Sequence, residues 1–284
     1  MNMIKKLLAV VALSFAYALS AGVAHGYKLD RAPDRLTDMA SLQNGAKLFV
    51  NYCLSCHSAQ SMRYNKLTEI GLTEEEISRN LLFTTDKVGD LMEIAMTKED
   101  GASWFGAAPP DLSVIARAKS VTMGPTGVDY VYSFLRTFYR DTSRPTGWDN
   151  LVFPSVGMPH VMWDRQGGNT LNRVTVAQED LEDGSQQWVR TTTNIDAHGF
   201  SDITREVLDN YSGDAVDNIK LTPVDPAASA AYDNDVADLA NFLGWMAEPV
   251  QLKRKQLGIW VLFFLGIFMV VAWRLNAAYW KHVR

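Results

Sequence analysis

Cysteine is scarce in this chain, because 284 residues contain only two, Cys53 and Cys56, three positions apart. A disulfide between them would close a very small loop and remove little entropy from the unfolded chain, so it would stabilise the fold only slightly. A structural zinc site needs four ligands. Cys53, Cys56 and His57 supply three, and since no other cysteine exists the fourth would have to come from His160 or His198.

Other signatures are missing as well. The chain has no phosphate-binding glycine loop, no internal repeat and no nucleophile–base constellation. Acidic residues are absent from both ends: residues 1–24 hold two lysines, residues 253–284 hold six lysines and arginines, and neither segment holds an acid. The chain has 27 basic and 32 acidic side chains in all, so the stretch between its ends has a net charge of −13. Such a field attracts cationic partners and repels nucleic acid, although acidity that only keeps a domain soluble is the alternative.

The N-terminal end is typical of a secretory signal peptide. Lys5 and Lys6 precede an apolar run, and small residues follow at its end. A basic start, an apolar middle and a small-residue exit predict a cleavable signal peptide over residues 1–24, with cleavage after Ala24 or Gly26. An uncleaved membrane anchor is the alternative. A mitochondrial presequence fits poorly, because the stretch is too apolar and has no arginine.

The C-terminal end predicts a membrane anchor over residues 253–284. From Leu257 to Trp273 no residue is charged or strongly polar, which is near the lower limit of roughly 17–25 residues for a spanning helix. We expect the helix at about residues 257–276. Aromatic residues that suit the membrane interface are Trp260, Trp273, Tyr279 and Trp280. A buried core helix is the alternative.

The orientation in the membrane follows from the signal peptide. Three cations lie on each side of the apolar run, so the positive-inside rule does not decide between the two orientations. An exported chain places residues 25–252 in the periplasm and leaves a short cytoplasmic tail. The predicted location is therefore the bacterial inner (cell) membrane, crossed once.

The spacing Cys53-x-x-Cys56-His57 favours covalent attachment of a c-type haem. Two thiols one helical turn apart can form thioethers with the two vinyl groups of one porphyrin edge. The next residue, His57, then lies under the ring and presents a nitrogen to the iron. A redox dithiol of the thioredoxin type is the alternative, but it needs a strand–helix context. Predicted export strengthens the haem interpretation, because c-type haem is attached outside the bacterial membrane.

Two helices are expected around this motif. Apolar residues recur at helical spacing from Leu42 to Cys53 and again from Val236 to Met246. Gly45, near the start of the first helix, would allow another element to approach closely. Such a pair suits a mainly α, monohaem class I cytochrome c-like domain, in which the two helices cross.

Further elements of the body are also predicted. Thr73 precedes three glutamates and is expected to cap a helix over residues 72–83. A helical stretch with an aromatic stripe is expected over residues 127–140. An alternating segment, residues 172–194, predicts a hairpin with an acidic tip inside an insertion at about residues 164–225.

The sixth iron ligand has several candidates within the exported body. Met158 stands out because Pro154, Gly157 and Pro159 suppress helix and make a stiff loop around it. Methionine there would give a high-potential electron carrier, whereas an open position would allow ligand binding or peroxide chemistry. His160 is the main rival, and Met162 offers the same chemistry without the adjacent proline. Other methionines, and His198, are less favoured.

Several segments occur in the order seen in the cytochrome c1 family. They are CLSCH, APPDLSVIARA, VDYVYSFL, FPSVGMPH and the ending WMAEPVQLKRKQLG before an apolar helix. The chain therefore resembles the haem-bearing subunit of quinol–cytochrome c oxidoreductase, the cytochrome bc1 complex. The likeness runs from about residue 40 to the C-terminus and is interrupted at about 164–225. One departure is that Pro-His-Val follows Met158, where many relatives have Ala-Pro-Pro.

The resemblance implies a set of site residues. His57 and Met158 would be the axial ligands of one covalent haem c, held by Cys53 and Cys56. Arg117 would point at a haem propionate, where a carboxylate needs a charge-assisted partner; a solvated charge is the alternative. Contacts with the haem are expected from Pro109, Pro110 and Tyr130.

The resemblance also implies a function and partners. The chain would pass single electrons from the Rieske iron–sulfur protein to a soluble, basic cytochrome c. It would sit beside cytochrome b in the lipid bilayer, within a dimeric complex of a respiratory or photosynthetic chain. It would do no bond-making chemistry itself, and no nucleic acid would bind. A membrane-anchored peroxidase and a tethered cytochrome c serving an oxidase are the alternatives.

Overall fold

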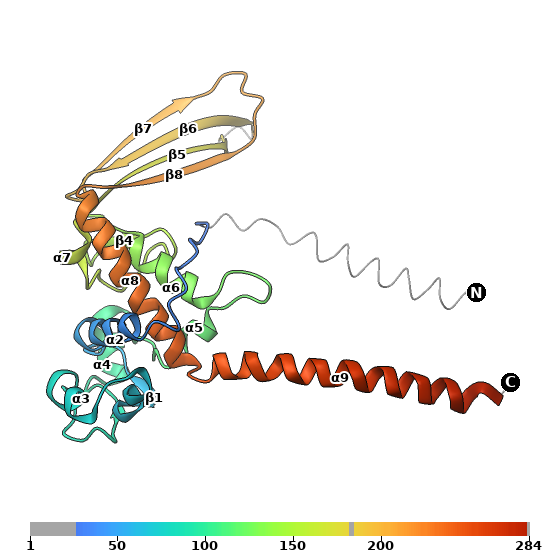
Figure 1. Ribbon diagram of the computed structural model, residues 1–284. Coiled ribbons are helices and arrows are strands. Elements are labelled where there is room, and N and C mark those ends of the chain that lie inside the picture. The colour runs from blue at the N-terminus through green and yellow to red at the C-terminus, as the bar shows by residue number, and fades with distance from the viewer. Residues whose placement is uncertain (1–26, 182–184, 283–284) are drawn as a thin grey trace.

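The computed structural model describes residues 27–181 and 185–282. The predicted signal peptide lies outside the described residues. Figure 1 shows three parts: a mainly helical body, a four-stranded sheet at one end of it, and a long helix that leaves the other end. The body carries the haem-attachment motif, so its packing positions the candidate site.

The core of the body is a crossing of two helices. They are α2, Met39–Leu48, and α8, Pro226–Ala247, with side chains of Asp38 and Asp225 capping their first turns. Gly45 lies at the contact, where an added Cβ would come within 2.3 Å of the Asp238 carbonyl oxygen. Glycine therefore lets the two backbones approach, which confirms the expected close crossing.

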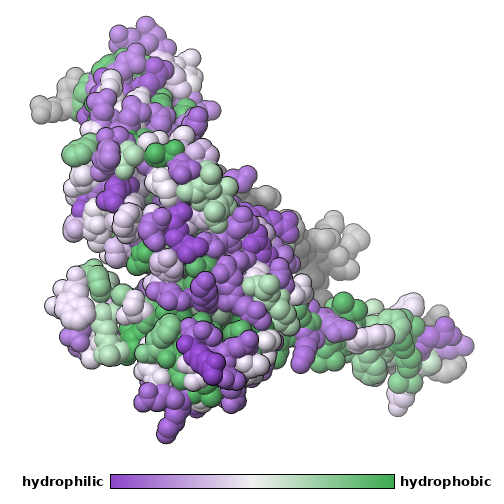
Figure 2. All heavy atoms as spheres, turned by 60° about the vertical axis from the view of Figure 1, so that its left-hand side comes forward, coloured by the Kyte–Doolittle hydropathy of each residue, from purple (hydrophilic) through white to green (hydrophobic). Residues whose placement is uncertain are grey.

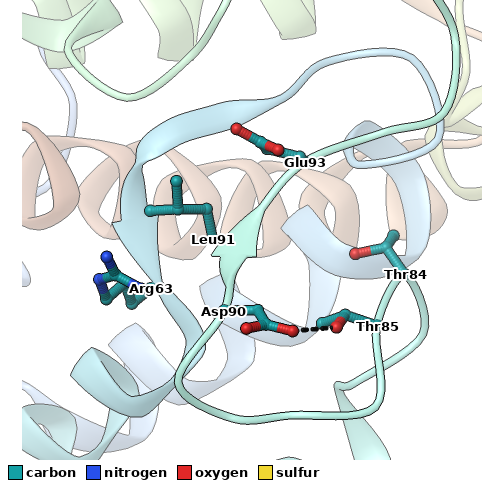
Figure 3. Close-up of a pocket in the computed structure, with 6 residues that line it drawn as sticks. All are labelled: Arg63, Thr84, Thr85, Asp90, Leu91 and Glu93. Carbon is teal, nitrogen blue, oxygen red and sulfur yellow. Dashed lines mark hydrogen bonds between the residues drawn. The ribbon is translucent and has the colours of Figure 1, made fainter.

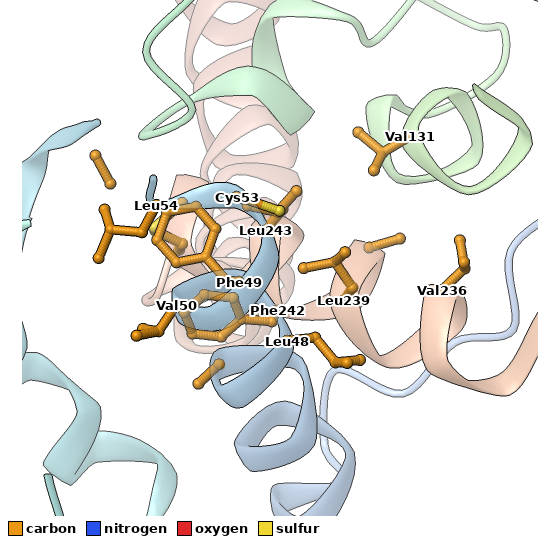
Figure 4. Close-up of a cluster of buried hydrophobic side chains, with 14 of the residues drawn as sticks. Leu48, Phe49, Val50, Cys53, Leu54, Val131, Val236, Leu239, Phe242 and Leu243 are labelled. Carbon is orange, nitrogen blue, oxygen red and sulfur yellow. The ribbon is translucent and has the colours of Figure 1, made fainter. Parts of the chain in front are cut away.

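Buried aromatic and aliphatic residues fill this crossing. Phe49 packs on Phe242 with ring centroids 5.7 Å apart, and Leu239 and Leu243 of α8 lie beside them (Figure 4). Cys53, the first residue of the haem motif, belongs to the same cluster. The motif is thus anchored in the main hydrophobic core.

Short elements surround the two crossing helices. In chain order they are a π-helix Phe49–Cys53, β1 Ala59–Arg63, a 3-10 helix Tyr64–Ile70, α3 Glu74–Asn80, β2 Leu91–Met92, α4 Lys98–Phe105, α5 Ile115–Ala118, α6 Gly127–Arg136, β3 Phe138–Arg140, β4 Trp148–Asn150 and α7 Trp163–Gln166. Strands β1 and β2 pair antiparallel, as do β3 and β4. The predicted cap of α3 is present, because Thr73 and Glu76 bond reciprocally to each other's backbone N–H groups.

The helix expected over residues 127–140 ends earlier than predicted. It stops at Arg136, and residues 138–140 form β3 against β4. The Thr137 hydroxyl donates to the carbonyl of Ser133, 2.9 Å away, and so engages an acceptor of the last helical turn. Pairing with a strand ten residues later then competes with further helix, which local periodicity does not reveal.

The predicted hairpin is part of a larger sheet. Strands β5 Asn169–Asp180, β6 Gln186–Ile195, β7 Ser201–Val207 and β8 Val216–Pro223 form an antiparallel sheet in the order β7-β6-β5-β8. The β5–β6 pairing confirms the hairpin. A small apolar cluster of Tyr139, Leu151, Leu171 and Ile195 joins the base of the sheet to the body.

The C-terminal helix α9, Gln251–Tyr279, projects away from the body, and a 3-10 turn, Trp280–His282, follows it (Figure 1). It is long and apolar enough to cross a membrane, and its 29 residues span about 44 Å at 1.5 Å per residue. Its apolar side chains are exposed along its length, as the green surface in Figure 2 shows. That exposure contradicts the alternative of a buried core helix.

Candidate haem site

The two cysteines lie shortly after the C-terminal end of α2. The helix continues into the π-helix Phe49–Cys53, and the Cys56 and His57 N–H groups then both donate to the carbonyl of Cys53. Single-turn π-helices are rare and often mark functional sites. Both thiols are free, with Cys53 buried and Cys56 half-buried. Burial raises the pKa of the Cys53 thiol to about 12, with Cys56 adding to the shift.

His57 is held in one ring orientation by a backbone carbonyl. Its Nδ1 lies 2.7 Å from the carbonyl oxygen of Pro110, and because that oxygen can only accept, Nδ1 carries the proton. The other nitrogen, Nε2, is then unprotonated. Burial lowers the pKa of His57, against smaller raising effects from Pro110 and Asp111. Metal-binding histidines favour this arrangement: a neutral ring in which Nδ1 donates to a carbonyl and Nε2 is free to bind a metal.

The APPDLS segment lies along the residues that follow the motif. The Leu112 N–H donates to the Ser58 carbonyl at 2.9 Å. The Gln60 N–H donates to Asp111 Oδ2 at 2.8 Å, and the Ser61 N–H donates to Ser113 Oγ at 2.9 Å. These bonds fix the position of Pro110 and therefore the ring of His57. Asp111 and Ser113 were not predicted as site residues, although an Asp two residues before a Ser signals a local turn.

Met158 lies on the predicted irregular loop and packs, half-buried, against the main core. The loop sits close to α4, because a Cβ on Gly157 would come within 3.1 Å of the Phe105 carbonyl oxygen. Helix α4 in turn contacts Pro109, whose Cδ would lie 2.7 Å from a Cβ on Gly101. Helix α4 thus connects the Met158 loop with the segment that holds His57.

His160, the main rival, is an interior residue with its ring engaged. The ring stacks on Phe138 at 4.7 Å and meets Trp148 and Tyr232 edge-on at 5.1 and 5.9 Å. Its Nε2 lies 3.1 Å from Gln166 Oε1. Burial lowers its pKa to about 3, so the ring is neutral. These contacts favour a packing role, and they leave Met158 as the better-placed candidate of the two.

Arg117 and Tyr130, two further predicted site residues, differ in exposure and in their neighbours. Arg117 is exposed, and its guanidinium has Glu248 as its nearest charged partner at 3.9 Å. Tyr130 is half-buried, stacks on Phe134 at 6.1 Å and carries Lys119 over its ring at 4.7 Å. The pairing of Arg117 with Glu248 was not predicted, because more than a hundred residues separate them in the chain.

The donor set fits a covalent haem better than a metal ion alone. Among residues 27–181 and 185–282, no group of three or more His, Cys, Asp and Glu side chains is arranged to hold a metal, which disfavours the zinc alternative. His198 is exposed in a turn, where its backbone N–H donates to Asp196 Oδ1. Large apolar side chains, Trp104 on α4 and Phe153 before Met158, are exposed on the elements that flank the motif. An apolar porphyrin face suits such a surface.

The hollow shown in Figure 3 does not coincide with this site. The hollow in Figure 3 has a volume of about 390 Å³ and is lined by Arg63, Thr84, Thr85, Asp90, Leu91 and Glu93. Two of its polar side chains, Thr85 and Asp90, hydrogen-bond to each other. None of the haem-motif residues lines it. The candidate site is therefore defined by its donor residues and not by a cavity.

Three known proteins are similar to this chain over most of its length. A cytochrome c1 of Allochromatium vinosum is 38% identical over 280 residues, which cover 98% of this chain and 99% of that protein. A protein of Nitrosomonas europaea named ammonia monooxygenase gamma subunit is 39% identical over 283 residues and all of both chains. A cytochrome b/c1 of Bradyrhizobium diazoefficiens is 26% identical over 81% of this chain and 31% of its own length.

These relatives have different names, and the match to a family model shows to which family this chain belongs. The model of the Cytochrome C1 family matches residues 32–169 and 222–283, which leaves out most of the four-stranded sheet. Members are haem-bearing electron-transfer subunits of the bc1 complex, whose other components include cytochrome b, and their cofactor is one covalently attached haem c. On this match and the near full-length similarity to a cytochrome c1, the chain belongs to the Cytochrome C1 family.

Proposed function

We propose that this chain passes single electrons from the Rieske iron–sulfur protein to a soluble, basic cytochrome c. The observation that carries the proposal is the motif geometry, in which two free thiols precede an imidazole that a backbone carbonyl orients. Membership of a family of haem electron-transfer subunits gives that geometry its role. The polypeptide itself makes and breaks no substrate bonds.

Each site residue has a proposed task. Cys53, the last residue of the π-helix, and Cys56, in the turn that follows, would form the two thioethers. His57 Nε2 would hold the iron, with the Pro110 carbonyl fixing the ring. Met158, on its stiff loop, would supply the second ligand. When bound, haem c supplies an iron that takes up and releases one electron at a time.

The residues around the site control access and charge. Met158 as the sixth ligand would close that position and disfavour peroxidase chemistry, which needs an open one, and the packing of its loop against α4 supports this assignment. Arg117 is exposed and close to the site segment, so we assign it to a haem propionate, with Glu248 as its neighbour. Pro110 and Tyr130 are the proposed contacts with the haem edge.

We further propose that α9 anchors the chain, crossing the membrane once at about residues 257–276. Its exposed apolar length supports this, as does the polar body at its start (Figure 2). Residues 25–252 would form a monohaem class I cytochrome c-like domain in the periplasm, with the sheet as an insertion at about 164–225. The signal peptide over residues 1–24 sets this orientation, and the complex would be a dimer.

Charge supports the choice of electron acceptor. The body has a net charge of −13, so a basic cytochrome c is attracted at long range. Such attraction raises the rate of encounter, while a small contact lets the carrier leave. A basic soluble cytochrome c is therefore the proposed downstream partner.

Transient reduction of the haem in the isolated complex tests the electron path. Quinol should reduce the c-type haem only when the Rieske protein is present, and a basic cytochrome c should then oxidise it. The same complex stripped of its Rieske protein is the control. Reduction at an unchanged rate in the stripped complex would exclude the proposed electron donor.

A second candidate function follows from the Nitrosomonas relative. Its printed name places it in an ammonia monooxygenase, and it is as similar to this chain as the cytochrome c1 is. The site chemistry would be unchanged, because a haem carrier could equally deliver electrons to or from an oxygenase. Co-purification with an ammonia-oxidising activity and not with cytochrome b would favour this second function.

A further inference from the structure

The loop between α5 and α6, residues 119–126, has an apolar tip in a compact conformation. Met123 is fully exposed, at 103%, and Val121 is exposed at 60%. Met123 also has a φ of 58°, in the left-handed region that side-chain-bearing residues rarely adopt. Asn or Gly would fill this position at lower cost, so a methionine that buries nothing within the chain calls for another explanation.

The base of this loop is firmly held. A Cβ on Gly127 would come within 1.8 Å of the Ala116 carbonyl oxygen, so the end of α5 and the start of α6 touch. The Ser120 hydroxyl donates to that same carbonyl and accepts from the Gly127 N–H. Bonds between Val121 and Pro125, and between Gly124 and Val121, close the tip. The apolar tip is therefore presented by a rigid support.

The loop points in the direction taken by the anchor. Figure 1 shows the α5–α6 connection leaving the body on the same side as α9. Arg117, just before the loop, lies 3.9 Å from Glu248, and Glu248 pairs with Arg254 in the first turn of α9. The start of the loop is therefore linked to the first turn of α9 through Arg117 and Glu248.

The charges around the loop differ from those of the rest of the body. No acid occurs between Asp111 and Asp129, and none follows Glu248, although the body as a whole has a net charge of −13. Lys119 lies in the loop, and the Ala32 N–H donates to Asp129 Oδ1, which brings the exposed Arg31 beside the start of α6. This surface is thus locally cationic next to the helix that leaves the body.

The nearby acids are already engaged. Asp129 accepts bonds from the backbone N–H groups of Ala32 and Thr126, and Asp30 pairs with Arg136. Glu248 pairs with Arg254. Within the described part of the chain, Arg31 and Lys119 have no carboxylate within 4.0 Å, and the Lys119 ammonium lies over the Tyr130 ring, 4.7 Å from its centroid.

We propose that residues 119–126 form a second membrane contact, with Val121 and Met123 inserted at the bilayer interface and Arg31 and Lys119 facing anionic lipid headgroups. An apolar tip flanked by cations is the combination that binds such a surface. This inference rests on the proposed anchoring by α9. The contact would fix the tilt of the haem domain over the membrane, which a single helix leaves free.

Site-directed fluorescence quenching in the complete complex, reconstituted in nanodiscs, tests the contact. Met123→Cys, Phe83→Cys and Val261→Cys each introduce a thiol for a fluorophore. Cys53 and Cys56 are thioether-linked in the haem-bearing chain, so they do not react with the label. Phe83, exposed at 61% and close to α3, is the matched control on the body, and Val261 reports on α9.

The expected result is specific to position and lipid. Nitroxide-bearing lipid should quench the label at position 123 at least twofold more than that at 83, whereas aqueous iodide should do the reverse. Quenching at 123 should be stronger with phosphatidylglycerol than with phosphatidylcholine alone, and equal quenching would overturn the headgroup contact.

Other results overturn the inference in distinguishable ways. If position 123 behaves like 83 while 261 is quenched by lipid, the anchor stands and the loop contact fails. If 123 is shielded from both quenchers, another protein subunit covers the loop. If lipid does not quench 261, the proposed anchoring itself fails.

Discussion

Replacing Gly45 with alanine tests the helix crossing on which the haem motif is built. The new Cβ would lie 2.3 Å from the Asp238 carbonyl oxygen and 2.5 Å from Phe242 Cβ. Ordinary contact begins near 3.4 Å, so α2 and α8 must separate by about 1 Å. A gap of that size forfeits a quarter to a half of the dispersion energy of the atoms that it separates.

The magnitude follows from two opposing effects. Overpacking of a close core contact costs about 1–3 kcal/mol. Alanine is better than glycine inside a helix by about 1 kcal/mol, which offsets part of that cost. The net expectation is a destabilisation of up to about 2 kcal/mol. For a domain of this size that lowers the melting temperature by up to roughly 8 °C.

Thermal unfolding of the haem-bearing protein in detergent, followed by far-ultraviolet circular dichroism, measures the effect. Gly89→Ala is the matched control, because nothing lies within 4 Å of a Cβ there. We expect that control to change stability by less than about 0.5 kcal/mol. A Gly45→Ala variant that melts higher than the natural protein would show that helix propensity dominates and that the crossing is not close.

Three further results are expected. Met158→Leu should lower the reduction potential of the haem by on the order of 100 mV, since axial ligands tune potentials over a range of about 0.8 V, and an unchanged potential in a redox titration would place the sixth ligand elsewhere. Replacing both Cys53 and Cys56 with serine should abolish covalent haem, and haem that still migrates with the denatured polypeptide on a gel would refute the attachment. Electron delivery to a basic cytochrome c should slow as salt rises and the Debye length falls below about 10 Å, whereas a flat salt response would reject electrostatic docking.

Local signals in the sequence predicted the elements that carry the site. The apolar spacing before Cys53 and the glycine at position 45 predicted a helix in a close crossing, and both are present. The Thr73 cap was predicted because its partner, Glu76, is three residues away. Each of these features depends on residues within one or two helical turns, which is why pattern alone could identify them.

Features that depend on distant residues could not be predicted in this way. The carbonyl that orients His57 belongs to Pro110, 53 residues further along the chain. The pairing of Arg117 with Glu248 joins segments even further apart. A hairpin was predicted from its alternating pattern and turn, but the outer strands β7 and β8 were not, because their pairing partners are set by the whole sheet. Burial of His160 likewise depends on Phe138 and Tyr232, from two other elements.

Purification of the chain from its native membrane in mild detergent tests the central claim most directly. Haem spectra and quinol-dependent reduction of a basic cytochrome c would be recorded on the same preparation. The account predicts that b-type haem, an iron–sulfur protein and that activity accompany the c-type haem of this chain. A chain that purifies alone with only c-type haem and no such activity would contradict its assignment as the electron-transfer subunit of a bc1 complex.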